Sequence, residues 1–258
     1  MRSIAMFKSH YSFGRSILTL EEPFDKSGKP VENSIFNLLV VNKLDTLVLV
    51  EDNMTGFLEA AKNCQSNNIK LIFGLRLSVT KSVCNQDEAS LKNRAKYIIF
   101  ARNQAGYQAL IKIWSFAAKN GFYYNPCIDF ENLEKFWSDN LILAIPFYDS
   151  FLHLNSFEGL FHVPKFDVIK PILLLENNDL PFDEYLRGKA SEYAKKNEFD
   201  TTEANSIFYK SRLDFIAYMT FRCISERTTI EKPELNHAGS DSFNFDRWLR
   251  NNNISVVP

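Results

Sequence analysis

The sequence has few glycines, no closely spaced cysteines and no long apolar run. Nine glycines are spread over 258 residues, and none belongs to a G-x-x-x-x-G-K-[ST], G-x-G-x-x-G or G-x-S-x-G pattern, so the common phosphate-binding and nucleophile-elbow motifs are excluded. Without a C-x-x-C pair, neither a zinc ribbon nor a disulfide framework is expected. This use of cysteine is typical of proteins from a reducing compartment. The four cysteines are Cys64, Cys84, Cys127 and Cys223.

The sequence also lacks an excess of charge of one sign, and it lacks a segment for export or membrane insertion. The formal net charge is −1, so a contact with nucleic acid would need a local basic patch. The first residues, MRSIAMFKSHYS, contain no signal-peptide core, and no apolar run approaches the length that spans a membrane. We therefore expect a cytoplasmic protein with no membrane contact.

What the sequence does contain is an alternation of short apolar runs and longer amphipathic segments. This alternation predicts an α/β fold whose mainly parallel strands form an open sheet or a closed barrel. Gly74 is expected to break one strand. The expected strands cover 3–7, 45–51, 69–79, 96–102, 140–146 and 170–177, and the expected helices cover 33–44, 56–68, 104–120, 129–137, 183–197 and 213–225.

The composition becomes polar after Ala238. The closing residues, RNNNISVVP, are typical of a linker or a frayed end. The sequence thus predicts a domain over 1–238 and a polar tail or linker over 239–258.

Two stretches carry a resemblance to a known family. Residues 96–129, KYIIFARNQAGYQALIKIWSFAAKNGFYYNPCID, and residues 53–79, NMTGFLEAAKNCQSNNIKLIFGLRLSV, resemble the PHP domain of the bacterial DNA polymerase III alpha subunit. Weaker similarities follow at 205–209 and 227–234. The resemblance implies a distorted PHP-type (β/α) barrel. In active members, divalent metals in the barrel mouth hydrolyse phosphoesters.

The metal-ligand positions that the resemblance implies are degenerate in this sequence. Their residues are Met6, Lys8, Arg15, Val50 with Glu51 (or Glu51 with Asp52 in a register shifted by one), Arg76, Tyr97, Phe147, Ser206 and Phe208. Apolar side chains do not bind hard divalent cations, and lysine and arginine repel them. We therefore expect no catalytic residues, no metal and no cofactor; Glu51, Asp52 and His10 are the weak metal candidates.

Three of these positions are cationic: Lys8, Arg15 and Arg76. One hypothesis is that they replace the metal charge and pair with Glu51 or Asp52, because unpaired buried charge is costly. The alternatives are that they extend to solvent at a relaxed barrel mouth, or that they bind an anion such as phosphate.

The other histidines are predicted to lie outside a metal site. His153 and His162 are expected in a loop or an edge strand, and His237 is expected to be solvated in the polar tail. Phe122, Tyr123 and Tyr124 are expected to pack rather than to stack on bases.

The resulting prediction is a catalytically inactive PHP-like domain of a DNA polymerase III alpha-type replicase, with a structural and subunit-binding role in DNA replication or repair. The expected partners are polymerase subunits or a proofreading exonuclease, with only indirect contact to DNA. The alternatives are a metal-dependent phosphoesterase with a rebuilt site and a stand-alone nucleic-acid or protein-binding module. The chain is either part of a longer DNA-directed DNA polymerase or free-standing.

Overall fold

The strands of the protein close into a barrel. The computed structural model describes residues 2–157, 159, 161–233 and 236–254. The ring runs β1–β2–β3–β4–β6–β7–β8 and back to β1, and β5 is added beside β3. The strands are β1 (Ile4–Phe7), β2 (Thr46–Glu51), β3 (Lys70–Thr80), β4 (Ala95–Ala101), β5 (Cys127–Asp129), β6 (Leu141–Ile145), β7 (Ile172–Leu175) and β8 (Thr201–Ile207).

Strand direction follows the expectation of a mainly parallel barrel. β1 is parallel to both β2 and β8, and β2 is parallel to β3 over Thr46–Glu51. The exception is β4, which runs antiparallel to β3 and β6. The predicted α/β barrel with mainly parallel strands is therefore confirmed, and the carboxyl ends of the parallel strands meet at one rim, the barrel mouth.

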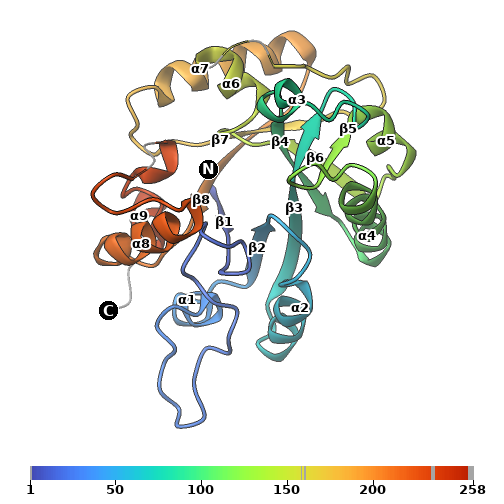
Figure 1. Ribbon diagram of the computed structural model, residues 1–258. Helices are drawn as coiled ribbons and strands as arrows, with labels where there is room; N and C mark the ends of the chain where they lie inside the picture. The colour runs from blue at the N-terminus through green and yellow to red at the C-terminus, as the bar shows by residue number, and fades with distance from the viewer. Residues whose placement is uncertain (1, 158, 160, 234–235, 255–258) are drawn as a thin grey trace.

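Helices cover the outside of this barrel (Figure 1). They are α1 (Ile35–Val41), α2 (Phe57–Ser66), α3 (Glu88–Lys92), α4 (Gln104–Lys119), α5 (Phe130–Lys135), α6 (Phe151–Phe157), α7 (Asp183–Asn197), α8 (Phe215–Glu226) and α9 (Phe245–Asn251). Side chains that cap amide groups fix several helix starts, such as Ser34 before α1 and Asn103 before α4. None of the described helices has the length and apolar character needed to cross a membrane.

Strand side chains alternate between two apolar clusters. Phe7 and Leu49 belong to the large cluster under the helices, whereas Met6, Val50 and Ile98 belong to a smaller cluster inside the barrel. This period of two is the geometry of a strand with both faces buried. It also directs the polar residues near the strand ends into the barrel mouth.

Gly74 does not break its strand as expected. β3 continues from Lys70 to Thr80, and Gly74 lies opposite Phe100 of β4. A Cβ atom at this position would lie 2.6 Å from Cε1 of Phe100, so the glycine makes room for an aromatic ring inside the barrel. The sequence-based expectation also missed β5 and β8.

The predicted polar tail is another point of difference, since much of it is folded. α9 follows Asn244, and Phe243, Phe245 and Leu249 are almost fully buried. The indole of Trp248 donates a hydrogen bond to the carbonyl of Ser3 at 3.1 Å, which holds α9 beside the start of β1. The polar residues around α9 outnumber its apolar residues, so the helical spacing of the apolar ones was overlooked in the sequence. Residues 255–258 of the predicted tail lie outside the described residues.

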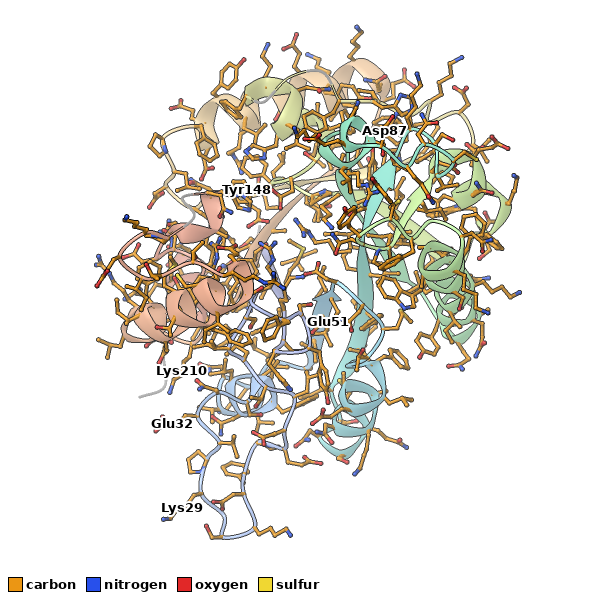
Figure 2. The ribbon with its side chains drawn as sticks, viewed as in Figure 1. Lys29, Glu32, Glu51, Asp87, Tyr148 and Lys210 are labelled. Atoms are coloured by element: carbon orange, nitrogen blue, oxygen red, sulfur yellow. The ribbon has the colours of Figure 1, made fainter. Side chains whose placement is uncertain are left out.

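One long connection extends away from the barrel. Lys29 and Glu32 mark this loop between β1 and α1, and Glu51 lies near the centre of the molecule (Figure 2). The far end of this loop is a small hairpin, in which Phe24 and Pro30 form an antiparallel bridge. Asp25 accepts amide hydrogen bonds in the turn of the hairpin.

Candidate functional site

The polar residues of the barrel mouth come from several strands. Lys8 follows β1, Arg76 lies within β3, Lys96 lies near the start of β4, Glu176 follows β7 and Ser206 lies near the end of β8. Each is an even number of residues from an apolar residue of the interior cluster on its own strand, such as Met6 before Lys8 or Leu174 before Glu176. The period of two therefore turns their side chains into the barrel interior, and their positions along the strands place them at the mouth.

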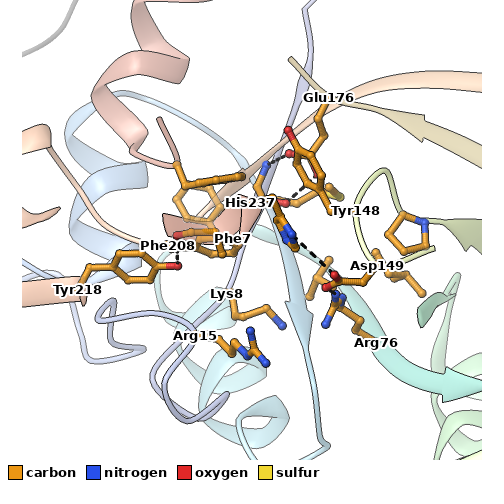
Figure 3. Close-up of a pocket in the computed structure, with 17 residues that line it drawn as sticks. Phe7, Lys8, Arg15, Arg76, Tyr148, Asp149, Glu176, Phe208, Tyr218 and His237 are labelled. Carbon is orange, nitrogen blue, oxygen red and sulfur yellow. Dashed lines mark hydrogen bonds and ion pairs between the residues drawn. The ribbon is translucent and has the colours of Figure 1, made fainter. Parts of the chain in front are cut away.

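All of these residues except Lys96 line a small cavity of about 50 Å³ (Figure 3). A space of this size holds a few water molecules at most. Its walls combine charged and aromatic side chains from β1, β3 and α8, from the segments that follow β1, β6, β7 and β8, and from the segment after α8. The principal members are Met6, Lys8, Arg15, Val50, Arg76, Tyr148, Asp149, Glu176, Ser206, Phe208, Tyr218, His237 and Phe243.

A chain of ion pairs crosses the mouth. Nζ of Lys8 lies 3.0 Å from Oδ1 of Asp52, and Nη1 of Arg76 lies 3.5 Å from the same oxygen. The other guanidinium nitrogen of Arg76 pairs with Asp149, whose second oxygen lies 3.7 Å from Nδ1 of His237. Two cations and two carboxylates thus neutralise one another in a mostly buried site.

The pKa shifts follow from this arrangement. Burial alone would raise the pKa of Asp52, but Lys8 and Arg76 outweigh it and hold that pKa well below its usual range. Burial would also raise the pKa of Asp149, but the charges of His237 and Arg76 outweigh burial and lower that pKa. For His237 burial dominates and lowers its pKa to about 4, so the imidazole is neutral at physiological pH.

Two further carboxylates are used to hold the backbone. Glu51, fully buried, accepts a hydrogen bond from the Ser9 amide at 2.9 Å and another from the Ser12 hydroxyl. Glu176 accepts from both the amide and the hydroxyl of Ser206 at 2.9 Å. Burial raises the pKa of each carboxyl against these hydrogen bonds. Their oxygens link β2 to the loop after β1 and β7 to β8.

The structure brings most of the predicted positions together. Those that line the cavity are Met6, Lys8, Arg15, Val50, Arg76, Ser206 and Phe208. Asp52 adjoins it through its ion pairs, so the hypothesis that Lys8 pairs with a neighbouring carboxylate agrees with the geometry. Within the described part of the chain, Arg15 has no ion pair shorter than 4 Å.

Besides Asp52, four predicted positions lie outside the cavity lining. Glu51 has the backbone role described above, and Tyr97 packs with Phe130, Phe151 and Phe166 under the helices. Phe147 is buried beside Tyr148, and His10 lies against the ring of Tyr11.

Sequence reasoning missed several residues of the mouth. Glu176 directly follows the apolar strand β7 and Asp149 lies in the loop after β6, positions beyond strand ends that could have revealed them. His237 is the clearest correction: its side chain is only 11% exposed and its ring stacks on Tyr148 at 4.4 Å, instead of lying in solvent. His153 is in α6 rather than in a loop or edge strand.

The mouth does not fit a divalent metal cluster. Among the residues that the structure describes, no group of three or more His, Cys, Asp or Glu side chains is placed to hold a metal ion. The nearby carboxylates of Asp52 and Asp149 already face Lys8 and Arg76, whose positive charges oppose a cation.

Comparison with known proteins agrees with this barrel geometry. Residues 35–196 match the model of the PHP domain. The chain belongs to the PHP domain family. Its residues under the match include β2 to β7 and α1 to most of α7.

Curated relatives are named DNA polymerase III subunit alpha. The PHP chain is 27% identical to the Aquifex aeolicus protein over 196 residues, which cover 70% of this chain and 17% of that protein. It is 26% identical to the Borreliella burgdorferi protein over 188 residues (67% and 16%) and 23% identical to the Treponema pallidum protein over 206 residues (74% and 17%). The matched region thus spans about one sixth of these relatives.

Proposed function

We propose that this chain is a catalytically inactive PHP domain of the DNA polymerase III alpha type, with a structural and subunit-binding role in DNA replication or repair. The ion-pair chain from Lys8 through Asp52 and Arg76 to Asp149 is the observation that supports it. Fixed side-chain charges occupy the mouth in which a phosphoesterase needs free carboxylates and imidazoles for metals.

An activity assay tests the first half of this proposal. The protein is incubated with Mn²⁺ and with p-nitrophenyl phosphate or its bis ester, next to an active PHP phosphoesterase. We expect no phosphate ester hydrolysis above the rate without protein, and no change in melting temperature with Mn²⁺ or EDTA. Metal-dependent turnover that is lost in Asp52→Asn would contradict the proposal and favour a rebuilt site.

Exposed apolar residues of α8 and of the turn before it, here called the α8 surface, support the subunit-binding half. Leu213 is 93% exposed, and Ile216 and Ile224 on the following helix are 63% and 61% exposed. Large exposed apolar side chains grouped in one place are typical of protein interfaces. We propose that this surface contacts a polymerase subunit or a proofreading exonuclease, and that the domain meets DNA only indirectly.

Complex formation tests this second half. The protein is mixed with DNA polymerase III subunits of its own organism, and complexes are measured by size-exclusion chromatography with light scattering. We expect Ile216→Glu with Ile224→Glu to abolish a complex that Leu58→Glu, on the exposed face of α2, leaves intact. Absence of any complex, together with salt-dependent binding to DNA, would instead favour a nucleic-acid-binding module.

Retained phosphate binding is the weaker expectation for the mouth. Lys8 and Arg76 are already paired, and the cavity of about 50 Å³ leaves little room. Arg15 is the remaining candidate, because it lines the cavity without a close ion pair to a described residue. A phosphate-induced rise in melting temperature that Arg15→Ala removes would show that this cationic group still binds an anion.

A further inference from the structure

The end of the barrel opposite the mouth contains a second, larger cavity. Its volume is about 360 Å³, within the range of roughly 300–1,000 Å³ that is common for small-molecule pockets. It is lined where strands β1, β2, β3, β6, β7 and β8 begin and where β4 ends. Met6 lines both cavities, so it lies between the charged mouth and this opposite end.

The wall of this cavity is apolar. The inward residues of the strand starts, including Ile4, Val48, Ile72, Ile142 and Ile172, line it, and Phe100 and Leu174 line it farther along their strands. At the strand starts, Ile4 is exposed and the other isoleucines and Val48 are only partly buried. Phe100 and Leu174 belong to the buried interior cluster. Apolar walls that water reaches favour an apolar ligand, because its burial removes that surface from water.

Two cations stand at the entrance. Lys70 begins β3 and Arg102 follows β4, and both side chains are exposed. Neither forms an ion pair within 4 Å with an acidic side chain in the described ranges 2–157, 159, 161–233 and 236–254. Lys70 and Arg102 differ in this from Lys8 and Arg76 at the mouth, where carboxylates neutralise both charges. An apolar chamber with unpaired positive charge at its rim is complementary to a molecule with an apolar chain and an anionic head.

We propose that this cavity binds a small aliphatic carboxylate, with its chain inside the barrel and its carboxylate near Lys70 and Arg102. The apolar lining supplies most of the affinity, and the two cations select the sign of the head group. Apart from Met6, this cavity shares no lining residue with the mouth, and none of its lining residues lies on α8, so its occupancy does not depend on the proposed inactive mouth or on the α8 surface.

Calorimetry with three probes of equal chain length tests the proposal: decanoate, decanol and decyltrimethylammonium. We expect decanoate to bind most tightly and the cationic probe most weakly. Because exposed ion pairs contribute modestly, Lys70→Glu with Arg102→Glu should weaken decanoate binding by about tenfold. Lys112→Glu with Lys119→Glu, two exposed lysines of α4, gives the same change in net charge and should leave affinity unchanged.

A cavity-filling substitution tests the location. Val48→Phe places a ring in the cavity and should abolish decanoate binding, whereas Val40→Phe, on the exposed side of α1, should not. Melting curves of each variant verify that it is folded. Equal binding of all three probes, or undiminished binding to folded Val48→Phe, would overturn the proposal. No decanoate binding up to about 1 mM would also overturn it, and would favour the cavity as a socket for apolar residues of another polypeptide.

Discussion

The guanidinium of Arg76 pairs with the carboxylate of Asp149 and thereby joins the middle of β3 to the loop after β6. The same guanidinium faces Asp52 at 3.5 Å. Burial opposes the raised pKa of Arg76, and the two carboxylates more than offset it. One side chain therefore compensates two acids that are both mostly shielded from water.

Removal of this guanidinium should destabilise the fold. Arg76→Ala leaves Asp52 and Asp149 without their shared cation, and we expect the free energy of unfolding to fall by about 2–3 kcal/mol, less than for a fully buried pair because all three side chains are partly exposed. Urea denaturation at pH 7 measures the loss.

Two controls separate charge from packing. Lys135→Ala removes a solvent-exposed helix pair with Glu131 and should cost no more than about 0.5 kcal/mol. Arg76→Met combined with Asp149→Leu should recover part of the loss, since apolar side chains replace an unpaired charge. Equal losses for Arg76→Ala and Lys135→Ala would show that the mouth network does not stabilise the protein.

The buried imidazole of His237 should make stability depend on pH. Its pKa is lowered from 6.5 to about 4, by burial against the opposing effect of Asp149. The unfolded chain therefore binds more protons below pH 6.5, so stability is full above that pH and falls as the pH drops toward 4, by up to about 3 kcal/mol. Urea titrations at a series of pH values measure the slope.

Substitution of the histidine isolates its share of that slope. His237→Gln should flatten the profile between pH 6.5 and 4, whereas His162→Gln should retain most of it because the His162 side chain is exposed. Acid unfolding near and below pH 3.8 should persist in both variants, since the lowered pKa values of Asp52 and Asp149 act in that lower window. An unchanged slope in His237→Gln would contradict the assignment.

Local pattern and family resemblance predict the barrel and many residues of its mouth. A period of two along apolar strands predicts that Lys8 and Arg76 face the barrel interior, and the family resemblance aligns both with metal-ligand positions of the mouth. His237 was not predictable in this way, because its place depends on how the segment after α8 returns across the barrel. The packed α9 was missed because Phe245, Trp248 and Leu249 stand among asparagine and charged residues that dominate the composition.

The contact between Gly74 and Phe100 should make β3 intolerant of a side chain. A Cβ atom there would lie 2.6 Å and 2.8 Å from two carbons of the Phe100 ring, so Gly74→Ala should cost about 1–3 kcal/mol. Gly188→Ala is the matched control: a Cβ atom there would meet no atom within 4 Å outside its own stretch of α7, and helix propensity should stabilise the protein by about 0.5–1 kcal/mol. Gly74→Ala with Phe100→Leu should regain stability; no regain would rule out this contact as the cause.

The indole of Trp248 tests whether residues beyond 238 belong to the folded unit. Trp248 is 7% exposed, stacks on Phe245 and donates to the carbonyl of Ser3. Trp248→Ala should lower the free energy of unfolding by about 3 kcal/mol, because it opens a cavity and leaves that carbonyl unpaired. Arg250→Ala, exposed on the same helix, should change it by less than about 0.5 kcal/mol. If α9 were a detached tail, both substitutions would leave the denaturation midpoint unchanged, and the packing of α9 on β1 would be wrong.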